Sequence, residues 1–165
     1  MDNKFVLAVY VDNKAGVLTR VSAMFTRRGF NIDTITSAGT DIPEYARITI
    51  AMSGDEYVKE QIINQLKKLY VVKKVLVLDD EPIKRELMLI KVRNKARERS
   101  DIMTAVDVFR ASVIDYSPEA MCIEVTGSPS KMDAFVKLMQ PFGILEMCRT
   151  GIVALDRGNV TLLNK

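Results

Sequence analysis

Histidine is absent from the 165 residues of this sequence. Because histidine is the side chain that most often acts as a general base near neutral pH, its absence excludes Ser-His-Asp and Cys-His catalytic units. Two cysteines without histidine also cannot supply the four protein ligands of a structural zinc site. No P-loop, glycine-rich dinucleotide motif or paired acidic motif is present. These absences disfavour an enzyme and a metal site, although a small enzyme that uses lysine or carboxylates stays open.

Long apolar runs are missing as well. The longest, from Phe5 to Val11, is far shorter than the ~20 residues that cross a bilayer, and no basic-then-apolar leader is present. We therefore expect a cytoplasmic protein without membrane association. Cys122 and Cys148 lie in apolar stretches typical of strands, so both are predicted to be small buried residues rather than disulfide or redox partners.

The first half of the chain alternates between strand and helix patterns. Residues 4–13 predict a strand with apolar side chains on both faces. The helix that follows ends at Gly29, a natural C-terminal cap, and its inward face is predicted to carry Val17, Leu18, Val21, Met24 and Phe25. A hairpin at 31–38 and 45–52, a second helix after an acidic start at 55–56 and a strand at 71–80 complete this half.

The second half repeats this order. A strand at 86–93 and a helix with Ile102, Val106 and Phe109 precede a hairpin that turns at Ser117-Pro118. Ser128 is the predicted N-cap of a last helix, whose inward residues are Phe135, Leu138 and Met139, and a strand at 144–156 follows. The order strand, helix, strand, strand, helix, strand is the ferredoxin-like arrangement. We therefore predict an α+β protein of two consecutive ferredoxin-like (βαββαβ) domains, at 1–79 and 85–165, joined by a linker at 80–84.

Residues 13–31, "NKAGVLTRVSAMFTRRGFN", could form a ligand site. The backbone N–H groups at a helix start attract anions such as a carboxylate, and Gly16 permits close approach. The amides of Asn13 and Asn31 offer acceptors for an ammonium group. An α-amino acid has both groups, although the same residues could simply form a turn and a cap.

The residues "NKAGVLTRVSAMFTRRGFNIDTIT" resemble the ACT domain in the small, regulatory subunit of acetolactate synthase. The resemblance continues through "KRELMLIKV", "VFRASVIDYSPEA", "GSPSKMDAFV" and "EMCRTGIVALDRG", in the order found in that family. It implies that the domain at 1–79 is an ACT domain and that the chain is a regulatory subunit without catalysis of its own. Its partner would be a catalytic large subunit that carries thiamine diphosphate, Mg and FAD, and this chain would hold no cofactor.

In that family the effector is a branched-chain amino acid, usually valine, bound between the ACT domains of a homodimer. Carried over by match, one subunit contributes Asn13, Ala15, Gly16, Val17 and Leu18, and the other contributes Asn31 and Ile32. The implied function is activation of the large subunit and feedback inhibition by valine in the synthesis of valine, isoleucine and leucine. An amino-acid-responsive transcriptional regulator is the alternative, but neither half has spare length for a DNA-reading motif.

Basic residues recur at every second position where a predicted strand runs into a loop, at Lys91, Arg93, Lys95, Arg97 and Arg99. If the extended geometry persisted, these side chains would lie on one side and could bind an acidic protein surface. The alternative is a solvated edge segment protected from aggregation by its charge. Nucleic acid is disfavoured because the net charge is only +3 and no aromatic residues are interleaved.

Overall fold

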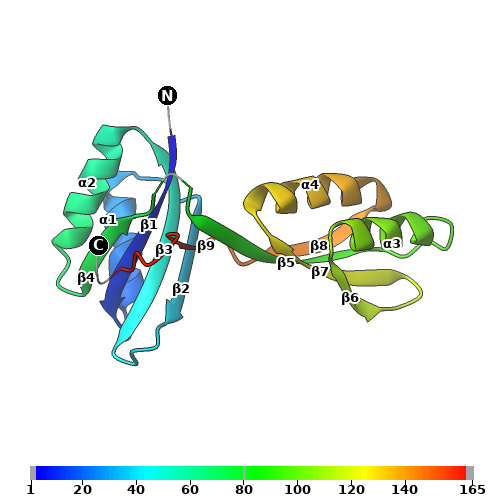
Figure 1. The fold of residues 1–165 in the computed structure, drawn as a ribbon, viewed down its shortest axis with the longest axis horizontal. Coiled ribbons are helices and arrows are strands. Elements are labelled where there is room, and N and C mark those ends of the chain that lie inside the picture. Colours follow the sequence, from blue (N-terminus) through cyan, green and yellow to red (C-terminus); the bar gives the residue numbers. More distant parts are fainter. Residues whose placement is uncertain (1–2, 80, 163–165) are drawn as a thin grey trace. The chain divides into compact units, whose positions relative to one another are not determined.

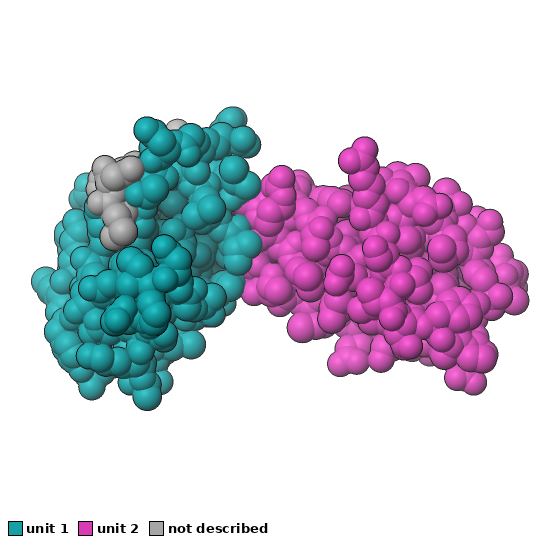
Figure 2. All heavy atoms as spheres, turned by 60° about the horizontal axis from the view of Figure 1, so that its bottom comes forward, with its two compact units in different colours: residues 1–83, 152–165 teal, residues 84–151 magenta. Residues whose placement is uncertain are grey.

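The computed structural model of the chain describes residues 3–79 and 81–162 and contains two compact units (Figures 1 and 2). The first unit is formed by the described residues up to Ile83 and from Ile152 onward, and the second by Lys84–Gly151. Each unit is an antiparallel sheet with two helices on one face, in the order strand, helix, strand, strand, helix, strand. The predicted fold class, two consecutive ferredoxin-like units, is confirmed.

The first unit has the strand order β2-β3-β1-β4. Its elements are β1 (Asn3–Asp12), α1 (Val17–Arg28), β2 (Thr34–Gly39), β3 (Tyr45–Gly54), α2 (Glu56–Lys67) and β4 (Val72–Val77). As predicted, Gly29 caps the end of α1 with a left-handed φ of 70°. Asp55 caps the start of α2 by accepting a hydrogen bond from the Val58 N–H at 2.8 Å.

One face of this sheet is buried beneath α1 and α2. From α1, the core receives Val17, Val21, Met24 and Phe25, as predicted. Leu18, which was expected on the same face, is 46% exposed. The prediction was wrong for this residue because only a narrow stripe of a helix that packs on a sheet is buried. Around the helix axis, Leu18 lies just outside that stripe.

The opposite face of the same sheet is covered by the C-terminal segment, residues 152–162, which contains the short strand β9 (Val153–Leu155). Ala154 and Leu162 pack against Val6, Ala8 and Tyr10 of β1. This cover explains why the first strand is apolar on both faces: each face has its own apolar layer.

Hydrogen bonds also hold this segment to the rest of the first unit. The guanidinium of Arg47 donates a hydrogen bond to the Ala154 carbonyl at 2.7 Å, and the Asp79 N–H donates to the Asp156 carboxylate at 2.8 Å. Burial lowers the pKa of Arg47, and the nearby Asp156 carboxylate partly offsets that effect.

The second unit has the strand order β6-β7-β5-β8. Its elements are β5 (Ile83–Arg93), α3 (Arg99–Val108), β6 (Ser112–Tyr116), β7 (Ala120–Gly127), α4 (Pro129–Met139), the 3-10 turn η1 (Gln140–Phe142) and β8 (Ile144–Arg149). The hairpin turn at Ser117 is closed by a hydrogen bond from its N–H to the Ala120 carbonyl at 2.8 Å, as expected. Ser128 caps α4 through the Lys131 N–H at 3.3 Å.

The helices α3 and α4 cover one face of the second sheet, and the other face carries no helix (Figure 1). Leu138 was predicted to point inward but is 42% exposed, whereas Met132, which was not predicted, is buried. Cys148 was predicted to be buried but is exposed, and Cys122 is half-buried; both are free thiols. The prediction failed because both cysteines are on strands of the second sheet, and one face of that sheet is not covered by a helix.

The boundaries of the two units differ from the predicted linker at 80–84 and the predicted second domain at 85–165. Residues 83–84 already belong to β5, and residue 80 lies outside the described residues. The expected strand at 144–156 stops at Arg149, two residues before Gly151, whose φ of 82° turns the backbone. The residues after Gly151 then pack in the first unit. Within the described ranges, no helix is long and apolar enough to cross a membrane.

Candidate functional site

The loop between β1 and α1, together with the first turn of α1, holds five of the seven predicted effector residues. Asn13 is anchored there by two hydrogen bonds: its backbone N–H donates to the Glu44 carbonyl at 2.8 Å, and its side-chain Nδ2 donates to the Pro43 carbonyl at 3.0 Å. Both bonds tie the loop to the residues that precede β3. The amide is therefore fixed in orientation, and its Oδ1 is the atom that can accept a hydrogen bond from a ligand.

Gly16 is the N-cap residue of α1, with a φ of 81° and a ψ of −4°. This left-handed conformation is favourable for glycine and unfavourable for residues with a β-carbon. Gly16 has no side chain to cap the helix, and the first turn contains no acidic residue. By contrast, α2 and α4 begin with the side-chain caps Asp55 and Ser128. The positive end of the α1 dipole is thus open to an external anion.

The apolar residues beside this helix start differ in exposure. Val17 is 6% exposed and packs in the core, so it anchors the start of α1 to the sheet. Leu18 is 46% exposed, and Ala15 is also exposed, so both are available to an aliphatic ligand side chain. Leu18 therefore provides a large apolar side chain at the surface beside the helix start.

Asn31 and Ile32 lie at the other end of α1, directly after its C-terminal cap. Asn31 is exposed, and Ile32 is half-buried against the core. Since α1 has 12 residues and an α-helix rises 1.5 Å per residue, about 18 Å of helix separates them from Gly16. A single chain therefore brings together Asn13, Ala15, Gly16, Val17 and Leu18, but not Asn31 and Ile32.

The ends of the sheet show the same separation. The β1–α1 loop lies beside the start of β3 and the end of β2, because Asp12 pairs with Tyr45 and Gly39 pairs with Ala46. The segment that holds Asn31 and Ile32 enters β2 at the opposite end, where the Asp33 N–H donates to the Ala51 carbonyl at 3.0 Å.

The basic residues at 91–99 do not continue as one extended row. Lys91 and Arg93 are on β5, but the strand ends at Arg93, and a turn leads into α3. Beyond that point, the cations make local contacts: Lys95 and Arg97 approach the Glu98 carboxylate at 3.3 and 3.5 Å.

Arg99, the last of these residues, donates a hydrogen bond to Asn94 Oδ1 at 3.0 Å and lies 5.5 Å from the centre of the Tyr116 ring. The five basic side chains would lie on one side only if the backbone were extended throughout, and it is not. A role for these residues in binding a partner stays a prediction.

No group of three or more His, Cys, Asp or Glu side chains within residues 3–79 and 81–162 is placed to hold a metal ion. The candidate site is therefore described by what the helix start, an amide and apolar side chains can bind. A helix start can bind a carboxylate, an amide oxygen can accept a hydrogen bond from an ammonium group, and an exposed leucine can contact an aliphatic group.

Two family models match the chain. One, described as an AHAS small subunit-like ACT domain, matches residues 7–74, and the other, described as the small subunit of acetolactate synthase, matches residues 85–158. The matches cover both halves, so the resemblance stated from the sequence is confirmed over most of the chain.

Individual relatives and a solved structure agree with these matches. The acetolactate synthase small subunit of Mycobacterium bovis is 46% identical over 153 residues, which cover 92% of this chain and 91% of that protein. The probable acetolactate synthase small subunit of Archaeoglobus fulgidus is 44% identical over 156 residues, covering 94% and 98%. The crystal structure of the acetolactate synthase small subunit from Thermotoga maritima matches with a TM-score of 0.90 at 40% identity, covering 96% of this chain and 99% of that chain. The chain therefore belongs to the family of acetolactate synthase small subunits.

Proposed function

We propose that this chain activates the catalytic large subunit of acetolactate synthase and makes that enzyme sensitive to feedback inhibition by a branched-chain amino acid, with valine as the first ligand to test. The chain itself performs no chemistry in this proposal. The condensation of two pyruvates, or of pyruvate with 2-oxobutyrate, belongs to the large subunit with its thiamine diphosphate, Mg and FAD. Membership in the small-subunit family supports the choice of partner.

The observation that carries the effector proposal is the open start of α1. The Val17 N–H donates to the Lys14 carbonyl at 3.4 Å, but the N–H groups of Leu18 and Thr19 have no side-chain cap and can donate hydrogen bonds to the ligand carboxylate. The anchored amide of Asn13 presents Oδ1 to the ligand ammonium group. Leu18, half-exposed beside this helix start, can contact an aliphatic side chain such as that of valine.

The strand order suggests how Asn31 and Ile32 join this site. β2 is at one edge of the first sheet, and edge strands of two copies can pair. In an antiparallel pair of β2 strands, the start of one strand lies beside the end of the other. The start of β2 follows Asn31 and Ile32, while its end lies at the same sheet edge as the β1–α1 loop. Two-fold pairing thus brings Asn31 and Ile32 of one copy toward Gly16 of the other.

The central experiment combines the purified chain with the synthase large subunit and measures acetolactate formation with and without valine. We expect higher activity in the complex than in the large subunit alone, and loss of that activity on addition of valine. Calorimetric titration of the isolated chain with valine should show saturable binding. Failure to associate with the large subunit would overturn the regulatory role. No saturable heat at millimolar valine from a folded sample would overturn the effector site alone.

A further inference from the structure

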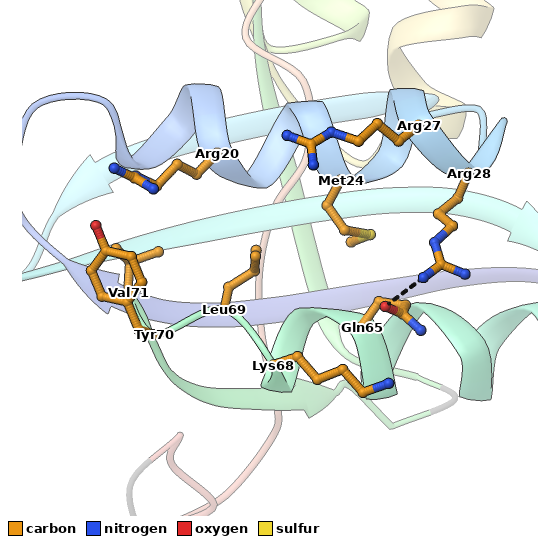
Figure 3. A pocket seen from close by; sticks show the side chains of 9 residues that line it. All are labelled: Arg20, Met24, Arg27, Arg28, Gln65, Lys68, Leu69, Tyr70 and Val71. Carbon is orange, nitrogen blue, oxygen red and sulfur yellow. Dashed lines mark hydrogen bonds between the residues drawn. The ribbon is translucent and has the colours of Figure 1, made fainter.

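A basic groove lies on the helical side of the first unit, between α1 and the segment that connects α2 to β4 (Figure 3). Its volume is about 360 Å³. Arg20, Arg27 and Arg28 extend from α1, and Lys68 extends from the end of α2 on the opposite side. The groove thus has cations on both of its walls.

The four cations lack ionic partners in the part of the chain that the structure describes. None of them is within ion-pair distance of a described carboxylate, whereas other cations of the chain, such as Lys73 with Asp12 at 2.9 Å, are paired. Arg28 donates a hydrogen bond to the neutral Gln65 side chain at 3.0 Å, which fixes its guanidinium without neutralising it. The groove therefore carries positive charge that an external anion can neutralise.

Between its charged walls, the groove is lined by apolar and aromatic side chains. Met24, Leu69 and Val71 lie between the walls, and Tyr70 stands at one end with 71% of its surface exposed. The Arg20 guanidinium lies 5.1 Å from the centre of the Tyr70 ring, which holds both side chains in place. Arg, Tyr and Met are the residue types enriched in protein–protein interfaces.

The spacing of the cations favours an extended partner over a small anion. Arg20 and Arg27 are seven residues apart on α1, which corresponds to about 10.5 Å along the helix axis. Two separate anionic groups at that spacing could each pair with one of them. Carboxylates seven residues apart on a partner helix would have the same spacing, and their apolar neighbours could contact Met24 and Leu69.

The groove is separate from the candidate effector site. Leu18 and Arg20 differ by about 200° around the axis of α1, so they lie on opposite flanks of the helix. A partner in the groove could therefore bind while an amino acid occupies the start of α1. Because α1 contributes to both sites, a movement of this helix would change the affinity of both sites for their ligands.

We infer that this groove docks an acidic segment of the acetolactate synthase large subunit, with carboxylates facing Arg20, Arg27 and Lys68 and an apolar side chain over Met24. The inference rests on the proposed function, because it takes the large subunit as the partner. It assigns the contact to the helical side of the first unit, rather than to the basic residues at 91–99.

Charge reversal at Arg27 tests the inference in the assembled complex. Arg27 is exposed and makes no hydrogen bond or ion pair with any residue that the structure describes, so Arg27→Glu should fold normally. The matched control is Lys137→Glu, because Lys137 is also an exposed cation in the last turn of a helix, α4 of the second unit. We expect Arg27→Glu to weaken association with the large subunit by about tenfold or more, with a shallower dependence on salt. Lys137→Glu should leave both unchanged.

Zero-length carbodiimide cross-linking identifies the contact directly, since it joins an amine to a carboxylate that touches it. In the wild-type complex, Lys68 should be joined to an Asp or Glu of the large subunit, and Arg27→Lys should add a second link nearby. Calorimetry should show that Arg27→Glu binds valine as the wild-type chain does.

The outcomes separate this inference from the proposed function. If the wild-type chain assembles with the large subunit but Arg27→Glu assembles equally well and Lys68 gives no cross-link, the docking assignment is wrong and the regulatory role stands. If the wild-type chain does not assemble, both fail. Saturable binding of inorganic pyrophosphate that requires Arg27, with unchanged assembly of Arg27→Glu, would identify a small-anion site and overturn the docking assignment.

Discussion

Gly16 meets two requirements at one position. Its φ of 81° is strained for any residue with a β-carbon, and the absence of a side chain leaves the start of α1 open. The space around an added β-carbon is empty within 4 Å in the chain, so packing alone does not demand glycine. Backbone conformation and access to the helix start are the two physical reasons for a glycine here.

Gly16→Asp is therefore expected to weaken valine inhibition of the reconstituted enzyme. The new carboxylate would cap the helix and repel the ligand carboxylate, so the valine concentration for half-inhibition should rise about tenfold or more. Backbone strain should cost about 1 kcal/mol of stability as well. The control is Gly158→Asp, which has a similar φ of 71° and equal free space, but lies outside the site. Unchanged inhibition in Gly16→Asp would refute the assignment of the helix start.

An ion pair between the buried Glu86 and the partly exposed Arg149 stabilises the second unit at the residue scale. Glu86 is 4% exposed and accepts hydrogen bonds from the Arg149 guanidinium, including one from Nε at 2.9 Å. Arg149 also donates to the more exposed Asp133 at 2.8 Å. Burial opposes the charged form of Arg149, but the hydrogen bonds and charges of Glu86 and Asp133 outweigh this, and the net pKa is raised.

Arg149→Met should destabilise the second unit by about 3 kcal/mol, because it leaves the Glu86 carboxylate buried without a cation. The double variant Glu86→Met/Arg149→Met should recover most of that loss, since neither charge is then buried. Denaturant unfolding, followed by amide exchange in β5 and β7, measures both. A double variant that is less stable than Arg149→Met would contradict this account.

At the scale of elements, the C-terminal segment acts as the second apolar layer of the first sheet. Leu162 is 6% exposed against this sheet, whereas Leu155 in β9 is 59% exposed. The two leucines offer a matched comparison within one segment, because the same substitution meets an apolar contact at one position and solvent at the other.

Leu162→Asp should detach the segment, because a carboxylate without a partner is costly to bury against Val6 and Ala8. We expect the free energy of local opening, measured by amide exchange at Ala154, to fall by about 2 kcal/mol. Leu155→Asp should change it by less than about 0.5 kcal/mol. Equal effects of the two substitutions would show that the segment does not serve as a cover.

At the scale of the whole molecule, the proposed effector site needs two copies of the chain. One copy supplies the helix start at Gly16 and the other supplies Asn31, because about 18 Å of α1 separates them within a chain. A site shared between two chains makes a specific prediction. A dimer of two different variants, each defective in one half of the site, can still contain one intact site, whereas a site within one chain cannot be restored in this way.

Mixed dimers of Gly16→Asp and Asn31→Ala, isolated with two affinity tags, should bind valine at one of two sites. One site combines both defects, while the other combines the intact helix start of one chain with the intact Asn31 of its partner. Each variant alone should bind at neither site, and calorimetry gives the stoichiometry. No binding by the mixed dimer would place the whole site within one chain.

Local signals in the sequence were sufficient where short-range physics decides. The caps at Gly29 and Ser128, the acidic start of α2 and the turn at Ser117 are as predicted, because each depends on one residue and its nearest backbone groups. The same signals failed for Leu18 and Leu138. Their burial depends on which flank of the helix meets the sheet, and a helical period alone does not specify that.

The sequence by itself determined the order of strands and helices, the caps at Gly29 and Ser128 and the family, because periodicity, turn chemistry and motif order are properties of neighbouring residues. Tertiary structure decided the rest: the cover formed by residues 152–162, the exposure of Cys148 and the gathering of unpaired cations from α1 and Lys68 in one groove. These features depend on contacts between residues far apart in the chain, which form only when the sheets and helices pack.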